Sequence, residues 1–211
     1  MSINTVLFDL DGTILDTNDL ITHSFKYTFE TYGLTFSNEE ILQFNGPPLI
    51  ETFTNINPEM AAEMVETYRE HNMKHHDEYV KLFPHVIETL EQLKEHNKKL
   101  AIVTAKMRSG ALYGIELTGL KPYFDSIVTV CDVSNSKPHP EPVLKAMKDL
   151  DGKPESTLMV GDNYHDIEAG KNAGVRTAGV AWSIKGKEYL EGLEPTYMLE
   201  DMKDVLTIVG V

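Results

Sequence analysis

The sequence contains a single cysteine and few basic residues, and these two shortages exclude several classes of protein. One cysteine, Cys131, permits no disulfide within the chain, which fits a reducing compartment such as the cytoplasm. The 19 Lys and Arg residues stand against 33 Asp and Glu residues, so the formal net charge is −14. Such an excess of negative charge opposes sequence-independent binding of nucleic acid or of an anionic membrane. We therefore expect a cytoplasmic protein without either partner. Cys131 follows an apolar stretch and is expected to be an inert core residue.

Long apolar runs and repeats are also absent. The sequence shows no membrane-spanning run of about eighteen apolar residues, no signal peptide or lipidation motif, and no internal repeat. Its 211 residues, of which 41% are hydrophobic and 25% charged, resemble those of an ordinary globular protein. This length is sufficient for one sizeable core and a smaller appended unit.

Between residues 17 and 81 the hydrophobic pattern is helical throughout. Apolar residues recur at helical spacing over residues 18–32, and Ser37 and Glu40 have the spacing of a capping box that begins a second helix. A third helix is expected to open at Pro58, because proline is favoured at the first helical position. No strand pattern interrupts this region, so residues 17–81 are predicted to form an all-helical cap domain.

In the rest of the chain, helical and strand patterns alternate. Residues 5–8 form a short apolar run that suits a strand buried on both faces of a sheet. Alternation with short connections predicts a parallel sheet with helices on both faces. We therefore predict an α/β protein whose Rossmann-like, doubly wound core comprises residues 1–16 and 82–211, with the helical cap inserted after the first strand. Further strands are expected near residues 100–104, 127–130, 158–160, 177–181 and 196–198.

The cap also contains three histidines, His71, His75 and His76. His71 and His75 have helical spacing, but no carboxylate or cysteine pattern completes a zinc site around them. We therefore expect these histidines to lie on an exposed face of the cap.

Chemically active side chains follow several of the predicted strands. In parallel sheets, ligands bind outside the carboxyl ends of the strands, so side chains at these positions are expected to meet. Taken singly, each residue has an ordinary explanation as a turn residue, a helix cap or a solvated lysine. Their joint placement favours a phosphate site. The residues concerned are Asp9, Asp11, Thr104, Lys137, Asp162 and Asp166.

Two of these carboxylates, Asp9 and Asp11, are separated by one residue directly after a buried strand. They would repel each other and raise one pKa unless a metal ion neutralised the site. An acidic protein that handles phosphate needs local cations, and a divalent metal would supply them.

The residues at the strand ends resemble the four motifs of the haloacid-dehalogenase-like phosphatases. The matching motifs are Asp9-Leu10-Asp11-Gly12-Thr13, Thr104, Lys137 and Gly161-Asp162-x-x-x-Asp166. The resemblance covers the whole chain, including the helical cap after the first motif. Residues 44–49, 160–166 and 177–186 are similar to the bacterial pyrophosphatases of this superfamily, and its phosphoglycolate phosphatases are the nearest alternative.

This resemblance implies a Mg2+-dependent phosphohydrolase with a small phosphorylated substrate, either pyrophosphate or, as the alternative, a phosphate monoester. Asp9 would be the nucleophile that forms an aspartyl-phosphate, and Asp11 would act as general acid and then as general base. The Asp9 carboxylate, the Asp11 backbone carbonyl and the Asp162 carboxylate would hold Mg2+, which prefers oxygen ligands.

The resemblance also implies contacts to the substrate. Thr104 and Lys137 would bind the phosphoryl oxygens, and Asp166 would orient Lys137 or a metal-bound water. Other residues are expected to bind substrate through the backbone, the cap turn or a basic side chain. These are Gly12, Gly46, Ala105, Lys106 and Arg108.

Two other functions remain open at this level. A phosphosugar mutase on the same scaffold would retain the phosphoryl group instead of transferring it to water. A phospho-aspartate switch of the response-regulator type also gathers acids, a threonine and a lysine around Mg2+. Such switches are shorter and carry the acceptor on a middle strand, whereas Asp9 follows the first strand here. Hydrolysis is therefore ranked first and the switch last.

Overall fold

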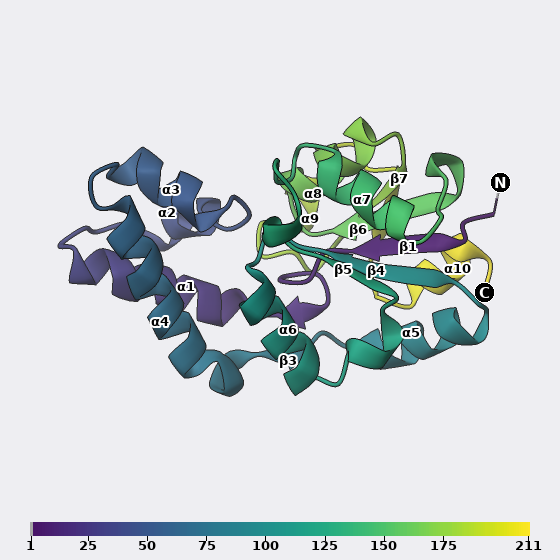
Figure 1. Cartoon of the computed structure of the whole chain (residues 1–211), viewed down its shortest axis with the longest axis horizontal. Helices are drawn as coiled ribbons and strands as arrows, with labels where there is room; N and C mark the ends of the chain where they lie inside the picture. Colours follow the sequence, from purple (N-terminus) through teal and green to yellow (C-terminus); the bar gives the residue numbers. More distant parts are fainter. Residues whose placement is uncertain (1) are drawn as a thin grey trace.

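Six parallel strands form the central sheet of the protein, seen in a computed structural model that describes residues 2–211. In the order β5-β4-β1-β6-β7-β8, β1 is flanked by β4 and β6 (Figure 1). The chain runs outwards from β1 through β4 to β5 and then returns to the other side of β1. This reversal creates the switch point at which such sheets bind ligands. The strands are β1 (Thr5–Phe8), β4 (Lys99–Val103), β5 (Ser126–Val128), β6 (Thr157–Gly161), β7 (Arg176–Val180) and β8 (Tyr197–Leu199).

Helices cover both faces of this sheet. Val6 and Phe8 of β1 pack into one apolar layer, and Leu7 between them packs into the other. All three side chains are fully buried, which explains their unbroken apolar run. The predicted doubly wound α/β core is therefore confirmed. One layer contains α5 (Val86–Glu95), α6 (Arg108–Leu117) and α10 (Asp204–Val209), and the other contains α7 (Glu141–Asp149) and α8 (Tyr164–Asn172) (Figure 1).

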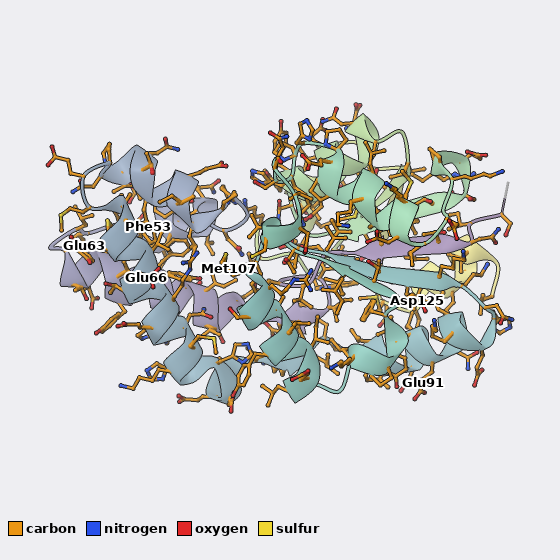
Figure 2. The ribbon with its side chains drawn as sticks, in the orientation of Figure 1. Phe53, Glu63, Glu66, Glu91, Met107 and Asp125 are labelled. Carbon is orange, nitrogen blue, oxygen red and sulfur yellow. The ribbon has the colours of Figure 1, made fainter. Side chains whose placement is uncertain are left out.

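The cap helices form a separate group, at the left of Figure 1. In the sequence they lie between β2 (Leu15–Asp16) and β3 (Lys81–Leu82). These two short strands pair antiparallel, so the chain enters and leaves the cap at one place. The cap has its own apolar cluster, which includes Phe25, Phe29 and Phe53 (Figure 2). The helical insertion after β1 is thus confirmed, and we propose 17–81 as its limits. Its helices are α1 (Asn18–Thr31), α2 (Asn38–Gln43), α3 (Leu49–Ile56) and α4 (Ala61–Tyr79).

Of the two helix starts predicted in the cap from local sequence signals, one is confirmed and one is wrong. The capping box before α2 is present: Ser37 Oγ accepts from Glu40 N–H at 3.2 Å, and Glu40 Oε2 accepts from Ser37 N–H at 2.7 Å. The prediction that a helix opens at Pro58 is wrong, because α4 begins at Ala61. Residues 57–60 form a turn in which Asn57 Oδ1 accepts from a backbone N–H. Helix α3 and, in the core, α9 (Lys187–Glu191) were not predicted.

The prediction that Cys131 is a core residue is also wrong. Strand β5 ends at Val128, and Val130–Asp132 forms a short 3-10 turn that exposes the thiol. Similar 3-10 turns occupy Lys121–Tyr123 and Pro154–Ser156. Among residues 2–211, no helix combines the length and the apolar character needed to cross a membrane.

His76 on α4 is fully buried, contrary to the exposed position predicted for it, whereas His71 and His75 are partly exposed. Its ring meets that of Tyr113 on α6 edge-on, with centroids 4.9 Å apart, so it packs at the junction of cap and core. Neither ring nitrogen has a hydrogen-bond partner in the described part of the chain, and Asp77 lies 3.6 Å from Nδ1. Burial is the main reason that the pKa of His76 is lowered.

This lowered pKa predicts a pH-dependent stability. Just below pH 6.5, the ordinary value for histidine, the unfolded chain binds more protons at His76 than the folded chain does. The free energy of unfolding should therefore fall between about pH 7 and about pH 5.5, and part of that fall should disappear in His76→Leu. Denaturant unfolding across this range measures the slope. His75→Leu, on the same helix but partly exposed, is the control, and an unchanged slope in His76→Leu would contradict the prediction.

Candidate active site

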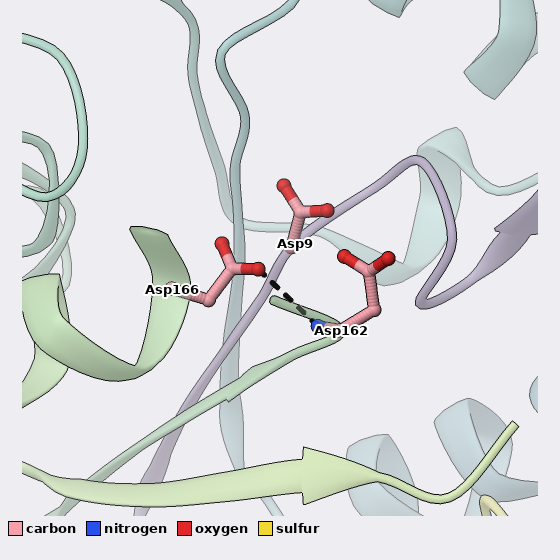
Figure 3. A group of neighbouring side chains, drawn as sticks. All are labelled: Asp9, Asp162 and Asp166. Atoms are coloured by element: carbon pink, nitrogen blue, oxygen red, sulfur yellow. Dashed lines mark hydrogen bonds between the residues drawn. The ribbon is translucent and has the colours of Figure 1, made fainter. Parts of the chain in front are cut away.

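Three carboxylates converge at the carboxyl edge of the sheet. Asp9 directly follows β1, Asp162 directly follows β6, and Asp166 lies in the first turn of α8 (Figure 3). One carboxylate oxygen from each lies within 4.8 Å of the other two, and all three side chains are buried. The adjacency of β1 and β6 in the sheet brings together residues that are more than 150 positions apart.

A single buried ammonium group joins two of these acids, Asp9 and Asp166. Lys137 Nζ lies 2.6 Å from Asp9 Oδ1 and 2.5 Å from Asp166 Oδ1, and it also donates to the Val103 carbonyl at 2.8 Å. Burial lowers the pKa of Lys137, but the charges of Asp166 and Asp9 outweigh burial and raise the pKa well above its ordinary value. Lys137 is buried and bonded on three sides, so the solvated-lysine interpretation is excluded.

Two glycines make room for this group. Gly12 has φ +83°, and a Cβ at this position would overlap the carboxylate of Asp162. A Cβ at Gly161 would overlap the side chain of Asp166. This side chain caps the start of α8, so the position must lack a Cβ. There Asp166 Oδ2 accepts the backbone N–H of Asp162 at 3.2 Å and that of Asn163 at 3.3 Å.

The charges at this edge do not cancel. With all three carboxylates ionised, they and the one ammonium would carry a formal charge of −2. Burial, with Asp166 adding repulsion, raises the pKa of Asp162 to about 7, and burial likewise raises the pKa of Asp9 well above its usual range. Uncompensated buried charge is costly, and a divalent cation would balance it. Clustered carboxylate oxygens suit a hard divalent metal, so the residues present fit a metal site.

Asp11 lies beside this carboxylate group but is paired differently. Its Oδ1 accepts from Lys106 Nζ at 2.8 Å, and both side chains are partly exposed. Thr104 Oγ1 accepts from the Lys106 backbone N–H at 3.1 Å, which leaves its hydroxyl proton available. Thr104 does not cap α6, because that helix begins only at Arg108.

A cavity of about 350 Å3 opens over these groups, between the core and the cap. Thr104, Ala105 and Lys106 line it from the core, and the Gly46 turn lines it from the cap. A Cβ at Gly46 would lie 3.1 Å from His165 Nδ1, so this turn approaches the core closely. The remaining cap wall is largely apolar, with Ile21, Phe25, Phe44, Leu49 and Met73.

Two of the predicted substrate-binding residues lie elsewhere. Arg108 does not line the cavity. Its guanidinium lies 2.5 Å from Asp132 Oδ2 and also donates to the Ile127 carbonyl at 3.4 Å. Gly12 also lies outside the cavity lining and instead admits Asp162.

Sequence reasoning missed several neighbours of the site. Asn163 Nδ2 donates to Asp162 Oδ1 at 3.0 Å, and Ser183 Oγ donates to the Asp162 carbonyl at 2.7 Å. The capping-box spacing of Asn163 and Asp166 could have identified Asn163 as the N-cap of α8, next to Asp162. Lys185 is held close enough that Asp162 and Asp166 raise its pKa, although burial outweighs them and lowers it overall. Ser183 and Lys185 follow β7 and lie within residues 177–186, a segment that resembles the pyrophosphatases, but that resemblance assigned them no role.

The sequence profile of the haloacid dehalogenase-like hydrolases matches residues 6–180. The chain therefore belongs to the haloacid dehalogenase-like hydrolase family, as its motifs indicated. It is 56% identical to the pyrophosphatase PpaX of Oceanobacillus iheyensis, over 100% of this chain and 98% of that protein. It is 53% identical to the pyrophosphatase PpaX of Anoxybacillus flavithermus, over 100% and 99%. A haloacid dehalogenase-like hydrolase structure from Streptococcus pneumoniae matches with a TM-score of 0.85 and 27% identity over 97% of each chain.

The fit of Gly12 against Asp162 can be tested with Gly12→Ala. The added methyl group should displace the Asp162 carboxylate and weaken divalent-metal binding by at least about tenfold, because a misplaced ligand loses its geometry. Gly33→Ala is the matched control, since Gly33 also has a positive φ, of 68°, but a Cβ there meets nothing within 4 Å. Both variants should lose roughly 1 kcal/mol of stability from backbone strain. Calorimetric metal titration is the measurement, and equal metal affinity in both variants would contradict the interpretation.

Proposed function

We propose that this hydrolase depends on Mg2+ and cleaves inorganic pyrophosphate to two phosphates through an aspartyl-phosphate on Asp9. The main support is the position of Asp9, which is buried at the edge of the sheet, bonded to Lys137 and grouped with two further carboxylates. The substrate is supported by the full-length likeness, at 56% identity, to a protein named as a pyrophosphatase.

In the first step, a carboxylate oxygen of Asp9 forms a bond to phosphorus while the bond from phosphorus to the bridging oxygen breaks. Lys137 fixes the orientation of this carboxylate through Oδ1. Asp11 donates a proton to the departing oxygen. Asp11 then takes a proton from the water that attacks the phosphorus of the aspartyl-phosphate, which releases the second phosphate and restores Asp9.

Charge stabilisation comes from three side chains on two loops, the loop after β4 and the loop before α7. The Lys137 ammonium and the free hydroxyl proton of Thr104 lie where they can meet the phosphoryl oxygens. Lys106, which also lines the cavity, can exchange its bond to Asp11 for a bond to the substrate. These contacts stabilise the charge that spreads over the oxygens during transfer.

Asp162 and Asp166, the two carboxylates grouped with Asp9, have distinct roles. Both oxygens of Asp166 already accept hydrogen bonds, one from Lys137 and the other from backbone N–H groups, so Asp166 positions Lys137. Asp162 Oδ1 accepts from Asn163, which leaves Oδ2 available. We therefore assign the carboxylates of Asp9 and Asp162, with the backbone carbonyl of Asp11, as the groups that would hold Mg2+. When bound, Mg2+ neutralises negative charge on the carboxylates and the phosphoryl group.

Asp9→Asn should reduce phosphate release from pyrophosphate by at least about a thousandfold, because the amide cannot form the covalent intermediate. Asp19→Asn, at an exposed position of α1, is the matched control and should retain wild-type turnover. Release of orthophosphate in the presence of Mg2+ is the measurement. Retention of more than a few per cent of activity in Asp9→Asn would count against the nucleophile.

Removal of the metal and a change of substrate test the remaining parts of the proposal. EDTA should stop phosphate release, and added Mg2+ should restore it. Pyrophosphate should be cleaved with a higher kcat/KM than phosphoglycolate or glucose phosphates. Isomerisation of a glucose phosphate without release of orthophosphate would instead indicate a mutase. Formation of a stable phospho-Asp9 without turnover would indicate a switch.

A further inference from the structure

The polar part of the cap wall is concentrated on one face of α4. Tyr68, Arg69 and Asn72 line the cavity from this helix, whereas most other cap residues that line it are apolar. Tyr68 is buried, and its hydroxyl is near enough to Asp11 that the carboxylate adds to the effect of burial in raising the tyrosine pKa. This face of α4 therefore faces Asp11, the residue that is proposed to donate a proton to the departing oxygen.

Arg69 has unused hydrogen-bonding capacity on this face. Its Nη1 lies 2.9 Å from Glu66 Oε1, one turn earlier on α4, and Glu66 is mostly exposed. The Nε of Arg69 is buried and has no hydrogen-bond partner in the described chain. A buried guanidinium N–H without a partner is unfavourable, and an exposed ion pair such as that with Glu66 contributes little. The guanidinium can therefore bind an anion in the cavity at small cost.

The other cations that line the cavity have buried or partly buried acids as partners, and the proposed function assigns them to the transferred phosphoryl group. Lys137 is bonded to Asp9 and Asp166, and Lys106 is bonded to Asp11. Among the cavity-lining residues that the structure describes, Arg69 alone among the lysines and arginines has a mostly exposed partner. Arg108, which sequence reasoning expected near the leaving group, is paired with Asp132 outside the cavity.

We infer that Arg69 is a specificity-determining residue that binds the anionic part of the leaving group from the cap side. The inference rests on the proposed transfer of a phosphoryl group to Asp9, and it defines the substrate class as anhydrides or esters whose leaving group carries its own negative charge. In pyrophosphate this part is the second phosphate. The planar guanidinium fork matches two phosphate oxygens at once, which a lysine cannot do.

The test compares two substrates in Arg69→Gln, with the full chain and Mg2+. Pyrophosphate has a charged leaving group, whereas p-nitrophenyl phosphate carries no charged group other than the phosphoryl group. The KM for pyrophosphate should rise by about ten- to a hundredfold, the size expected for a lost hydrogen bond to a charged group. The kcat/KM for p-nitrophenyl phosphate should change by less than about twofold, because this substrate has no charged leaving group for Arg69 to bind.

Two further variants separate charge from geometry. Lys74→Gln removes a positive charge from an exposed position on the same helix and should change neither substrate's kinetics. Arg69→Lys retains the charge but not the fork, so its KM for pyrophosphate should lie between those of the wild type and Arg69→Gln. Undiminished p-nitrophenyl phosphate activity in Arg69→Gln also shows that the variant is folded.

The possible outcomes distinguish this inference from the proposed function. If the wild type cleaves pyrophosphate and Arg69→Gln does so with the same KM, or loses activity equally on both substrates, the role of Arg69 is overturned alone. If the wild type cleaves p-nitrophenyl phosphate but not pyrophosphate, the proposed substrate is overturned, and the role of Arg69 fails with it.

Discussion

The site at the carboxyl edge of the sheet depends on one ammonium group, that of Lys137. It is held between Asp9, at 2.6 Å, and Asp166, at 2.5 Å. This contact connects the end of β1, the loop before α7 and the first turn of α8. One ammonium cannot balance three carboxylates, and Asp162 has no comparable cationic partner. The edge therefore has an excess of buried acidic groups. Much of the surrounding structure serves to tolerate that excess. Gly12 admits one carboxylate, and the backbone N–H groups at the start of α8 bond another.

This local excess also explains how so acidic a chain can handle phosphate. Most of its negative charge has little bearing on the site, because exposed charges are screened over about 8 Å in physiological salt. What matters is the cavity, where cationic side chains gather and a divalent ion has a place among carboxylates. The cap contributes a largely apolar wall and, from Arg69, one guanidinium that lines the cavity. We thus propose that chemistry and selectivity reside on different parts of the chain.

The core was predictable because a buried strand identifies its own carboxyl end. Asp9 and Asp162 follow unbroken apolar runs, so the strand-end rule placed them together without any knowledge of strand order. Lys137 by itself carried no such signal, and it was included because it lies in the connection that follows the predicted strand 127–130, at the same edge of the sheet. Arg108 lies outside the cavity lining, because nearness to Thr104 in sequence does not fix where the first side chain of a helix points. Arg69 and His76 depend on how α4 docks against the core, and a helical period reveals a face but not its neighbour. Short elements such as α3 offered too few residues to be recognised.

The central claim is that a divalent cation balances the buried charge of this edge. Thermal unfolding of the wild type and of Asp162→Asn, each in EDTA and in saturating Mg2+, tests it most directly. Mg2+ should raise the Tm of the wild type by several degrees and leave that of Asp162→Asn nearly unchanged. In EDTA, Asp162→Asn should melt above the wild type, because one repelling buried carboxylate has been removed. A wild-type Tm that does not respond to Mg2+, or an equal response in Asp162→Asn, would contradict the account.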